Sequence, residues 1–414
     1  MKKLDVYIQV NGEFVYVGDI VGKDYSDATF GYVDDYLASA LRPISISLPL
    51  QKERFSKEQT YRYFEGLLPE GFARRSVAKW IETDELDYLT ILEKLGSECL
   101  GAIRIGDAKQ EDSYELLSTS RIKVLASEGA TESTKLLLET HLSLTGASGK
   151  VGLYYDEQGN KWYLPHGLNA STHILKQSHI RYKKMVVNEL LCMRVAMEMG
   201  IDVAESSIMN LGSGKDEDVL YVTRRFDRVM PGDSSHGMVS PYRLHQEDFG
   251  QAMGIDAINK YETVKQGYIG RMFDLVRSYS SNPVEDVLKL WDMIVFNYLI
   301  GNTDSHVKNY SLLYSAGQDQ IRLAPAYDII STKVYDGMEN MAYYIGDERN
   351  IKNIGAEQFK MAADEARISQ SVAMERYNHI ARNIGEVISK VSAEMASEGF
   401  EDAVWVGEKI VGLR

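Results

Sequence analysis

The sequence predicts an α+β protein of two lobes, in which a β-rich N-terminal lobe with an extra N-terminal subdomain precedes an all-helical C-terminal lobe. The chain has 414 residues, which is long for one hydrophobic core, since about 100–200 residues per domain is usual. Strand-like runs gather before residue 235, and long helix-like runs follow it. We therefore expect an α+β subdomain over residues 1–110, a β-rich lobe over 111–235 and a helical lobe over 236–414.

The first unit opens with β-structure and continues with helices. Residues 6–10 and 14–17 are strand-like and flank Asn11-Gly12, a pair that is typical of a tight hairpin turn. The pattern then becomes helical over residues 57–95, with an interruption at Pro69 and Gly71. This is the pattern of a small α+β subdomain.

The second unit is predicted to be rich in short strands. The polar, irregular stretch 107–134 predicts a boundary before it. Apolar residues from Val186 to Met197 recur at spacings of four, three and four, which predicts an amphipathic helix that Gly200 ends. The predicted strands cover residues 142–144, 150–156, 161–164, 173–176 and 219–223.

The remainder of the chain is predicted to be helical. The expected helices cover residues 263–280, 283–300, 356–368 and 370–398. A β-rich lobe followed by a helical lobe occurs in several folds, so the side chains that can carry chemistry must decide among them.

Composition excludes some classes of function. Lys and Arg number 46 against 60 Asp and Glu, and a net charge of −14 disfavours a broad grip on nucleic acid. The most apolar run, residues 291–300, contains Asp292 and Asn297, so we expect no membrane segment and a cytoplasmic protein. Cys99 and Cys192 lie in no metal-binding pattern and are expected to be buried, reduced thiols.

A glycine-rich turn is predicted between two strands. Residues 146–150 read Gly-Ala-Ser-Gly-Lys, and such a turn can place backbone N–H groups against phosphates. It is not a Walker A loop, because that motif needs Ser or Thr after the lysine and Val151 follows Lys150. A phosphate-binding hairpin and a plain tight turn remain the two interpretations.

A lysine and a glutamate follow this turn in the order that kinases use. Lys176 ends an apolar strand, where its ammonium must reach solvent or find an anion. In a kinase, such a lysine binds the α- and β-phosphates of ATP and pairs with a helix glutamate. Glu189, on the next predicted helix, is the candidate partner. Either residue alone is compatible with an ordinary surface charge, and it is their order that favours a nucleotide site.

The segment after the apolar run ending at Ile300 carries Asp304 and Asn309, five residues apart. The catalytic aspartate and the metal-binding asparagine of kinases have the same offset. A carboxylate here can accept the proton of a substrate hydroxyl, and an amide oxygen can help to hold magnesium. Asp and Asn also cap turns, which is the structural alternative.

Asp328 lies inside the apolar stretch 323–330, where an unpaired carboxylate would be costly to bury. A divalent cation relieves that cost. Mg²⁺ suits a site of one carboxylate, one amide oxygen, phosphate oxygens and water. We therefore predict that Asp328 and Asn309 hold Mg²⁺.

Taken together, these segments resemble the successive motifs of the HipA family of serine/threonine-protein kinases. The resemblance extends from about residue 40 to residue 330 and implies a bilobal, protein-kinase-like fold that uses ATP and Mg²⁺. The matching segments are residues 41–50, 67–70, 144–150, 172–176, 225–228, 246–248, 301–309 and 327–330.

The resemblance also implies roles for individual residues. Asp304 would be the catalytic base, with His306 and Lys308 completing the catalytic loop and Lys308 reaching the γ-phosphate. Ser143 matches the family's autophosphorylation position, and Ser148 is the alternative. The residues implied on the ATP side are Ser148, Gly149, Lys150, Lys176, Glu189, Arg224 and Phe226.

The resemblance implies the toxin of a toxin–antitoxin system, which phosphorylates a translation-related protein such as an aminoacyl-tRNA synthetase and so inhibits growth. Its partner would be a HipB-like helix-turn-helix antitoxin, through which alone it would reach DNA. A small-molecule phosphotransferase could use the same Asp, Asn and Asp roles, but the N-terminal motifs argue against it. A non-catalytic pseudokinase is a second alternative, and it has no need of intact Lys176, Asp304, Asn309 and Asp328 together.

Overall fold

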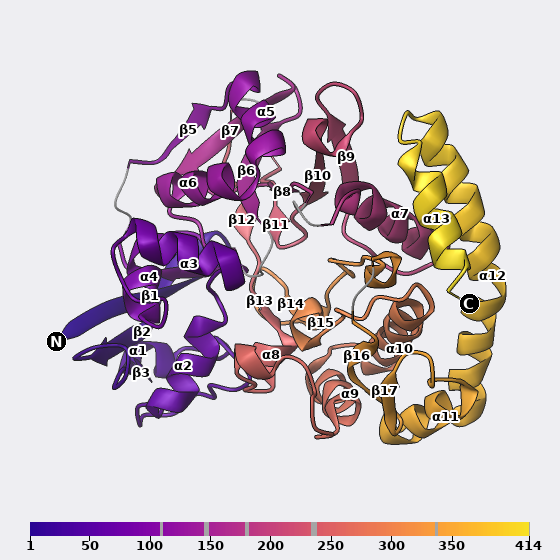
Figure 1. Ribbon diagram of the computed structural model, residues 1–414. Coiled ribbons are helices and arrows are strands. Elements are labelled where there is room, and N and C mark those ends of the chain that lie inside the picture. The colour runs from indigo at the N-terminus through magenta and orange to yellow at the C-terminus, as the bar shows by residue number, and fades with distance from the viewer. Residues whose placement is uncertain (108–110, 145–148, 179–181, 233–237, 336–337, 414) are drawn as a thin grey trace.

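The computed structural model describes residues 1–107, 111–144, 149–178, 182–232, 238–335 and 338–413 (Figure 1). At the N-terminus an antiparallel sheet of order β3-β2-β1-β4 packs with four helices around its own core. The predicted hairpin at Asn11 and Gly12 is confirmed, since both have positive φ and Val10 pairs with Glu13. The elements are β1 (Lys2–Val10), β2 (Glu13–Gly22), β3 (Thr29–Tyr32), α1 (Asp34–Ala38), α2 (Lys57–Glu65), α3 (Gly71–Trp80), α4 (Tyr88–Leu95) and β4 (Ile103–Ile105).

The second sheet has six antiparallel strands in the order β5-β7-β6-β8-β10-β9. Two expectations were wrong here. Residues 142–144 form only an isolated bridge through Leu142, and the stretch expected to be irregular holds a strand and a helix and reaches into a second helix. The elements are β5 (Ser113–Leu116), α5 (Thr119–Glu128), α6 (Ala130–Thr140), β6 (Lys150–Asp156), β7 (Lys161–His166), β8 (His173–Lys176), α7 (Met185–Glu198), β9 (Ser206–Asn210) and β10 (Val219–Arg224).

The C-terminal lobe is mainly helical, but the expectation of an all-helical lobe was wrong. Its helices are α8 (Phe249–Ala252), α9 (Tyr268–Tyr279), α10 (Pro283–Leu299), α11 (Ala356–Glu365), α12 (Gln370–Ser397) and α13 (Asp402–Val411). Strand β11 (Arg228–Val229) precedes the lobe and pairs with its first strand, β12 (Tyr242–Arg243). The other strands of the lobe are β13 (Gln246–Asp248), β14 (Ser311–Tyr314), β15 (Ile321–Leu323), β16 (Asn340–Ile345) and β17 (Glu348–Asn350). Most are two to four residues long, too short for alternation of polar and apolar residues to identify them.

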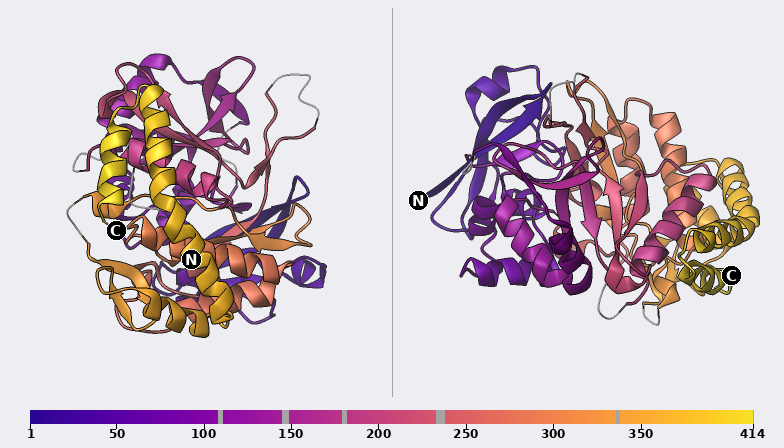
Figure 2. Two further views of the ribbon diagram at one scale, coloured as in Figure 1. Left: turned by 90° about the vertical axis from the view of Figure 1, so that its right-hand side faces the viewer. Right: turned by 90° about the horizontal axis from the view of Figure 1, so that it is seen from above.

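The largest hydrophobic core joins α7 to the helices of the C-terminal lobe. Helices α12 and α13 pack on each other and on α7, and Figure 2 shows this pair at the C-terminal edge of the molecule. Among the described helices, none has both the length and the hydrophobicity that crossing a membrane would need. Both cysteines are free and buried, as expected.

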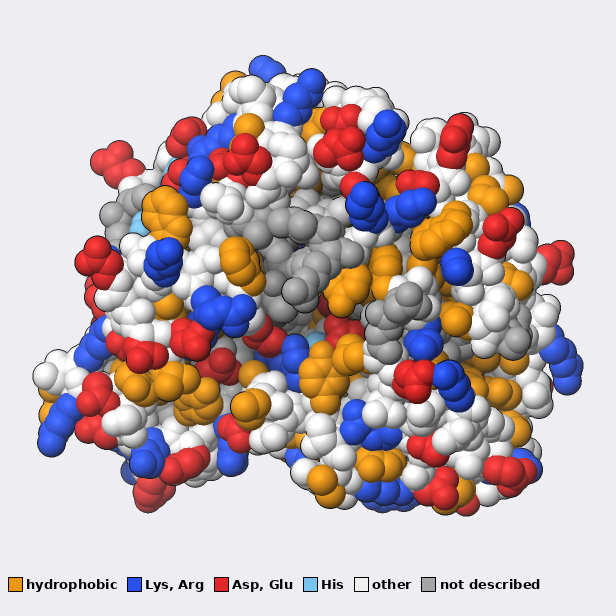
Figure 3. All heavy atoms as spheres, in the orientation of Figure 1, with side chains coloured by type: hydrophobic (Ala, Val, Ile, Leu, Met, Phe, Trp, Pro, Cys, Tyr) orange, Lys and Arg blue, Asp and Glu red, His pale blue; other side chains and the backbone are white. Residues whose placement is uncertain are grey.

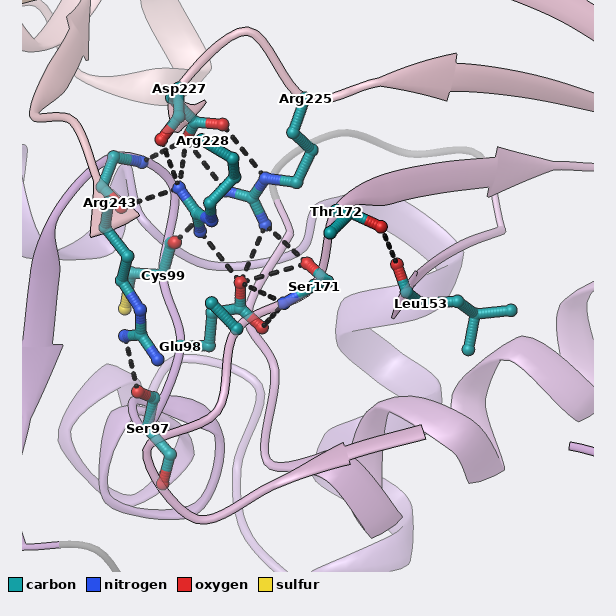
Figure 4. Close-up of polar contacts among 12 residues, drawn as sticks. Ser97, Glu98, Cys99, Leu153, Ser171, Thr172, Arg225, Asp227, Arg228 and Arg243 are labelled. Atoms are coloured by element: carbon teal, nitrogen blue, oxygen red, sulfur yellow. Dashed lines mark hydrogen bonds and ion pairs between the residues drawn. The ribbon is translucent and has the colours of Figure 1, made fainter. Parts of the chain in front are cut away.

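A buried network of charges fixes the N-terminal subdomain to the segment after β10 (Figure 4). Glu98 accepts from Arg225 at 3.1 Å and from Arg228 at 2.8 Å, and all three side chains are almost fully buried. Asp227 accepts from the Gly101 N–H at 2.9 Å. Burial raises the pKa of Glu98, but the guanidinium groups of Arg228 and Arg225 outweigh it and hold that pKa below its ordinary value. Removing one partner would leave a buried charge unpaired, which is strongly destabilising.

A second buried carboxylate joins the same subdomain to β14 and predicts a pH effect on stability. Glu247 accepts from the Ser45 hydroxyl at 2.6 Å and from the Tyr314 hydroxyl, and burial raises its pKa to about 7. A carboxyl with a raised pKa in the folded state binds its proton more tightly there than in the unfolded chain. The free energy of unfolding therefore falls as pH rises from about 4.5 to 7.

We expect Glu247→Gln to remove this contribution, so that the free energy of unfolding of wild type falls by about 3 kcal/mol relative to that of the variant between pH 4.5 and 8. Urea unfolding at several pH values measures the difference. Glu357→Gln, a surface change, is the control and should follow wild type. Parallel pH profiles for wild type and Glu247→Gln would contradict the assignment.

Candidate active site

A cavity of about 400 Å³ lies between the β-rich lobe and the C-terminal lobe. In the face shown in Figure 3, acidic and basic side chains meet in a hollow near the centre of the molecule. The sequence-predicted residues that line the cavity are Lys150, Lys176, Glu189, Arg224, Phe226, Asp304, His306, Lys308, Asn309 and Asp328. Gly149 and Ser143 are not among its lining residues, and Ser148 lies outside the described residues.

The Lys176 ammonium joins two carboxylates from different lobes. Its Nζ lies 2.6 Å from Glu189 Oε1, on α7, and 2.5 Å from Asp328 Oδ1, on the segment after β15. Burial lowers the pKa of Lys176, but the charges of Asp328 and Glu189 outweigh this and raise it above the ordinary value. The lysine therefore stays charged, as a phosphate-binding group must.

Asp328 has a backbone conformation that side chains rarely adopt, with φ of 57°. Such strain is held in place by surrounding structure and often marks functional positions. Burial raises the pKa of Asp328, but Lys176 and Lys150 hold it well below its usual range. Lys150 lies opposite Lys176 in the β6–β8 pair, where burial lowers its pKa to about 8. Two lysines and one carboxylate thus face the same space.

The loop after α10 presents Asp304 and Asn309. The Asp304 N–H donates to the Asn302 side chain at 3.1 Å, and the hydroxyl of Tyr261 donates to the Asp304 carboxylate. The Asn309 amide nitrogen donates to the Asp304 carbonyl at 3.0 Å, so its amide oxygen is the atom left to bind a ligand. Burial raises the pKa of Asp304 although the Tyr261 hydrogen bond opposes this, which moves the carboxylate toward the range of a general base.

His306 and Lys308 differ in what they can do. Burial, helped by the charge of Lys260, lowers the pKa of His306 to about 3, so this ring is neutral at pH 7. The Lys308 ammonium lies 3.0 Å from Asp248 Oδ2 and donates to the Gly66 carbonyl at 3.2 Å. These buried acceptors anchor the loop through Lys308, and its reach to a γ-phosphate stays a prediction.

Of the remaining predicted residues, Phe226 and Arg224 line the cavity and Ser143 does not. Phe226 packs against Tyr327 with ring centroids 5.6 Å apart. Arg224, two residues before Phe226, has a side chain that is about half exposed. Ser143 is completely buried outside the cavity, where its hydroxyl donates to the Leu67 carbonyl at 2.6 Å. Ser143 thus lies between the N-terminal subdomain and the β-rich lobe.

The site also contains residues that we did not identify from the sequence. Tyr261, Lys260 and Glu70 all line the cavity, and Asp248 completes the surroundings of Lys308. Glu70 and Asp248 lie in segments that resemble family motifs, and that resemblance could have identified them as site residues. Lys260 and Tyr261 lie in an irregular segment before α9, where no local pattern marks them.

The cavity offers a pair of oxygen ligands that could bind magnesium, from Asp328 and Asn309. Among the described residues, no three His, Cys, Asp or Glu side chains are grouped closely enough to form a metal cage. Asp328 and Asn309 both line the cavity and offer one carboxylate and one amide oxygen. This hard-oxygen set suits Mg²⁺ that takes its other ligands from phosphates and water.

A lysine–glutamate pair in the β-rich lobe, opposite an Asp–Asn loop and a second aspartate, defines a bilobal protein of the kinase-like class. Family models for the HipA N-terminal domain and the HipA-like C-terminal domain match residues 6–106 and 142–393. The chain therefore belongs to the HipA family.

Individual relatives agree with this assignment. The putative kinase Y4mE of Sinorhizobium fredii is 31% identical over 391 residues, covering 91% of this chain and 89% of that protein. The serine/threonine-protein kinase toxin HipA of Shewanella oneidensis is 27% identical over 405 residues, covering 91% and 88%.

A solved structure confirms the fold. It is the complex of Shewanella oneidensis HipA, HipB and operator DNA, in which one chain matches with a TM-score of 0.76 at 21% identity. The match covers 99% of this chain and 97% of that chain.

Proposed function

We propose that this chain is an ATP-dependent serine/threonine protein kinase. The observation that carries the proposal is that Lys176, Glu189 and Asp328 meet in one cavity with Asp304 and Asn309. Phosphoryl transfer needs this combination, because its catalysis consists mainly of positioning and of stabilising charge on phosphate oxygens.

In the proposed reaction, Lys176 binds phosphate oxygens of ATP while Glu189 keeps its ammonium in place. Asp304 orients the substrate hydroxyl and accepts its proton as the hydroxyl oxygen forms a bond to the γ-phosphorus. The bond from that phosphorus to the β,γ-bridging oxygen breaks, and its electron pair leaves with ADP. Magnesium, which Asp328 and Asn309 would hold, neutralises phosphate charge when bound.

The partners that we propose follow from the family. The similar solved structure holds HipB and operator DNA beside HipA, so we propose a helix-turn-helix antitoxin as partner and DNA contact only through it. The net charge of −14 agrees with indirect DNA contact. A translation-related protein, such as an aminoacyl-tRNA synthetase, is the proposed substrate, and its phosphorylation would inhibit growth.

The test is to induce the protein in cells without the proposed antitoxin and compare phosphopeptides with those from cells that express Asp304→Asn. The proposal expects growth arrest and a new phosphoserine or phosphothreonine on a translation protein with the active form only. Transfer to free sugars or antibiotics, with none to lysate proteins, would favour a small-molecule phosphotransferase instead.

We also expect autophosphorylation at Ser143. Because Ser143 is buried, its segment must first move out of the position that it occupies in the structure. The hydroxyl must leave the Leu67 carbonyl and the backbone must leave the Glu98 carbonyl before ATP can reach it. Added phosphate would bring about −1.5 to −2 charges and would disfavour return to this buried position. We expect phosphate at Ser143, or at Ser148, after incubation with MgATP, and weaker ATP binding by Ser143→Asp. Mass spectrometry that finds neither serine modified in active protein would contradict this.

A further inference from the structure

Glu70 extends from the N-terminal subdomain into the wall of the cavity. It precedes α3, whose first residue, Gly71, has φ of +54°, a conformation that favours glycine. The Glu70 side chain makes no capping hydrogen bond to this helix, although it occupies the N-cap position. It is free to reach across to the C-terminal lobe, and its side chain is only 14% exposed.

Two lysines of the C-terminal lobe meet this carboxylate. Glu70 Oε2 lies 2.6 Å from Lys260 Nζ, and Glu70 Oε1 lies 3.7 Å from Lys308 Nζ. Glu70 Oε1 is buried and has no hydrogen-bond donor among the described residues. Glu70 therefore faces both cations at the point where the subdomain meets the catalytic loop.

Both lysines are close to Asp304, Lys308 along the chain and Lys260 through its neighbour Tyr261. Lys308 lies four residues after it on the same loop. Lys260 precedes Tyr261, whose hydroxyl donates to the Asp304 carboxylate, and the Lys260 ammonium lies 5.5 Å from the centre of the Tyr261 ring. Burial raises the pKa of Asp304 and the charge of Lys260 opposes that effect, which places Lys260 within electrostatic reach of the base.

Removing the Glu70 charge would leave Lys260 without its close partner in a largely buried place. Lys308 keeps Asp248 at 3.0 Å, so it is less dependent on Glu70. An unpaired buried ammonium is costly, so a new pairing with an anion within reach is favoured. Asp304 is such an anion, because the charge of Lys260 already acts on it. Pairing with Lys260 would occupy the carboxylate that has to accept the substrate proton.

We propose that Glu70 is a positioning residue, which holds Lys260 away from the catalytic carboxylate of Asp304 and so makes the N-terminal subdomain part of the active site. This inference rests on the proposed kinase function. It assigns the subdomain a role in the phosphoryl-transfer step itself, beyond its contribution to the fold.

The test compares steady-state kinetics of Glu70→Gln with wild type. We expect kcat to fall roughly 10- to 100-fold, as for misplacement of catalytic groups by about 1 Å, with KM for ATP nearly unchanged. The matched control is Arg62→Gln, which breaks the Arg62–Asp256 ion pair between the same two parts of the molecule outside the cavity. That variant should keep the wild-type kcat.

Lys260→Met distinguishes positioning from a structural role. If Glu70 acts by restraining Lys260, then Glu70→Gln changes kcat less than about twofold in the Lys260→Met background, since interacting sites are not additive. If Glu70→Gln does not unfold cooperatively, Glu70→Asp replaces it. The shorter aspartate side chain cannot keep the 2.6 Å contact with Lys260, and its kcat is compared in the wild-type and Lys260→Met backgrounds.

If wild type is active and Glu70→Gln has the same kcat, the inference is overturned while the proposed function stands. The same loss in both Lys260 backgrounds, or an equal loss in Arg62→Gln, would also overturn it. Wild-type protein that turns over no MgATP would overturn the proposed function, and this inference with it.

Discussion

Asp304→Asn is expected to lower phosphoryl transfer by roughly 10²–10⁴-fold, the usual contribution of a positioned general base. This loss corresponds to about 3–5 kcal/mol of transition-state stabilisation. Asparagine keeps the size of the side chain and can still accept from the Tyr261 hydroxyl. It has no carboxylate to take the substrate proton, so chemistry should suffer while folding and ATP binding persist.

Rates of phosphate transfer from labelled MgATP measure this change, with ATP affinity and thermal unfolding recorded for the same preparations. Asp256→Asn is a matched control, because Asp256 pairs with Arg62 outside the cavity. It should behave as wild type. An Asp304→Asn enzyme with near-normal activity would remove Asp304 from the mechanism.

The second large effect is expected from Asp328→Ala, which deletes the only carboxylate that we assign to magnesium. It also removes one of the two anions that hold the Lys176 ammonium. Wild type should bind ATP more tightly with magnesium than with a chelator. The variant should bind it equally under both conditions and show no measurable transfer.

Calorimetric titration of ATP, with magnesium or with chelator, makes the comparison. Asp202→Ala changes a carboxylate that lies outside the cavity and is 56% exposed, and it should keep the full magnesium dependence. If Asp328→Ala keeps that dependence too, the metal must bind elsewhere.

Much of this site could be predicted because its residues lie in regular elements or at their ends. The strand pattern placed Lys150 and Lys176 on strands that pair directly in β6 and β8. The helical spacing placed Glu189 on α7, 13 positions after Lys176 in the sequence. The order of strand lysine and helix glutamate, compared with that in kinases, was sufficient to predict the pair of Lys176 and Glu189, whereas the pairing of β6 with β8 was not predicted.

Other parts depend on contacts that local sequence does not reveal. The contacts of the Lys308 ammonium with Asp248 and with the Gly66 carbonyl of the N-terminal subdomain were not predicted. The partnership of Glu70 with Lys260 joins residues 190 positions apart. Such pairings depend on how subdomains dock.

Fold predictions failed where elements are short or weakly patterned. Strands β13 and β15 have three residues each, so their pairing with β14 shows only in the folded structure. Helix α5 has few apolar anchors, although Ser118 caps it by accepting from the Arg121 N–H, a signal that the sequence offered.

The most direct test of the account is transfer of a labelled γ-phosphate from MgATP to protein, by purified wild type and by Asp304→Asn, in a cell lysate. We expect labelled phosphoserine or phosphothreonine with wild type and magnesium, and almost none with the variant or with chelator. Absence of label with wild type, or equal label with Asp304→Asn, would contradict the proposal that this cavity is a protein-kinase active site.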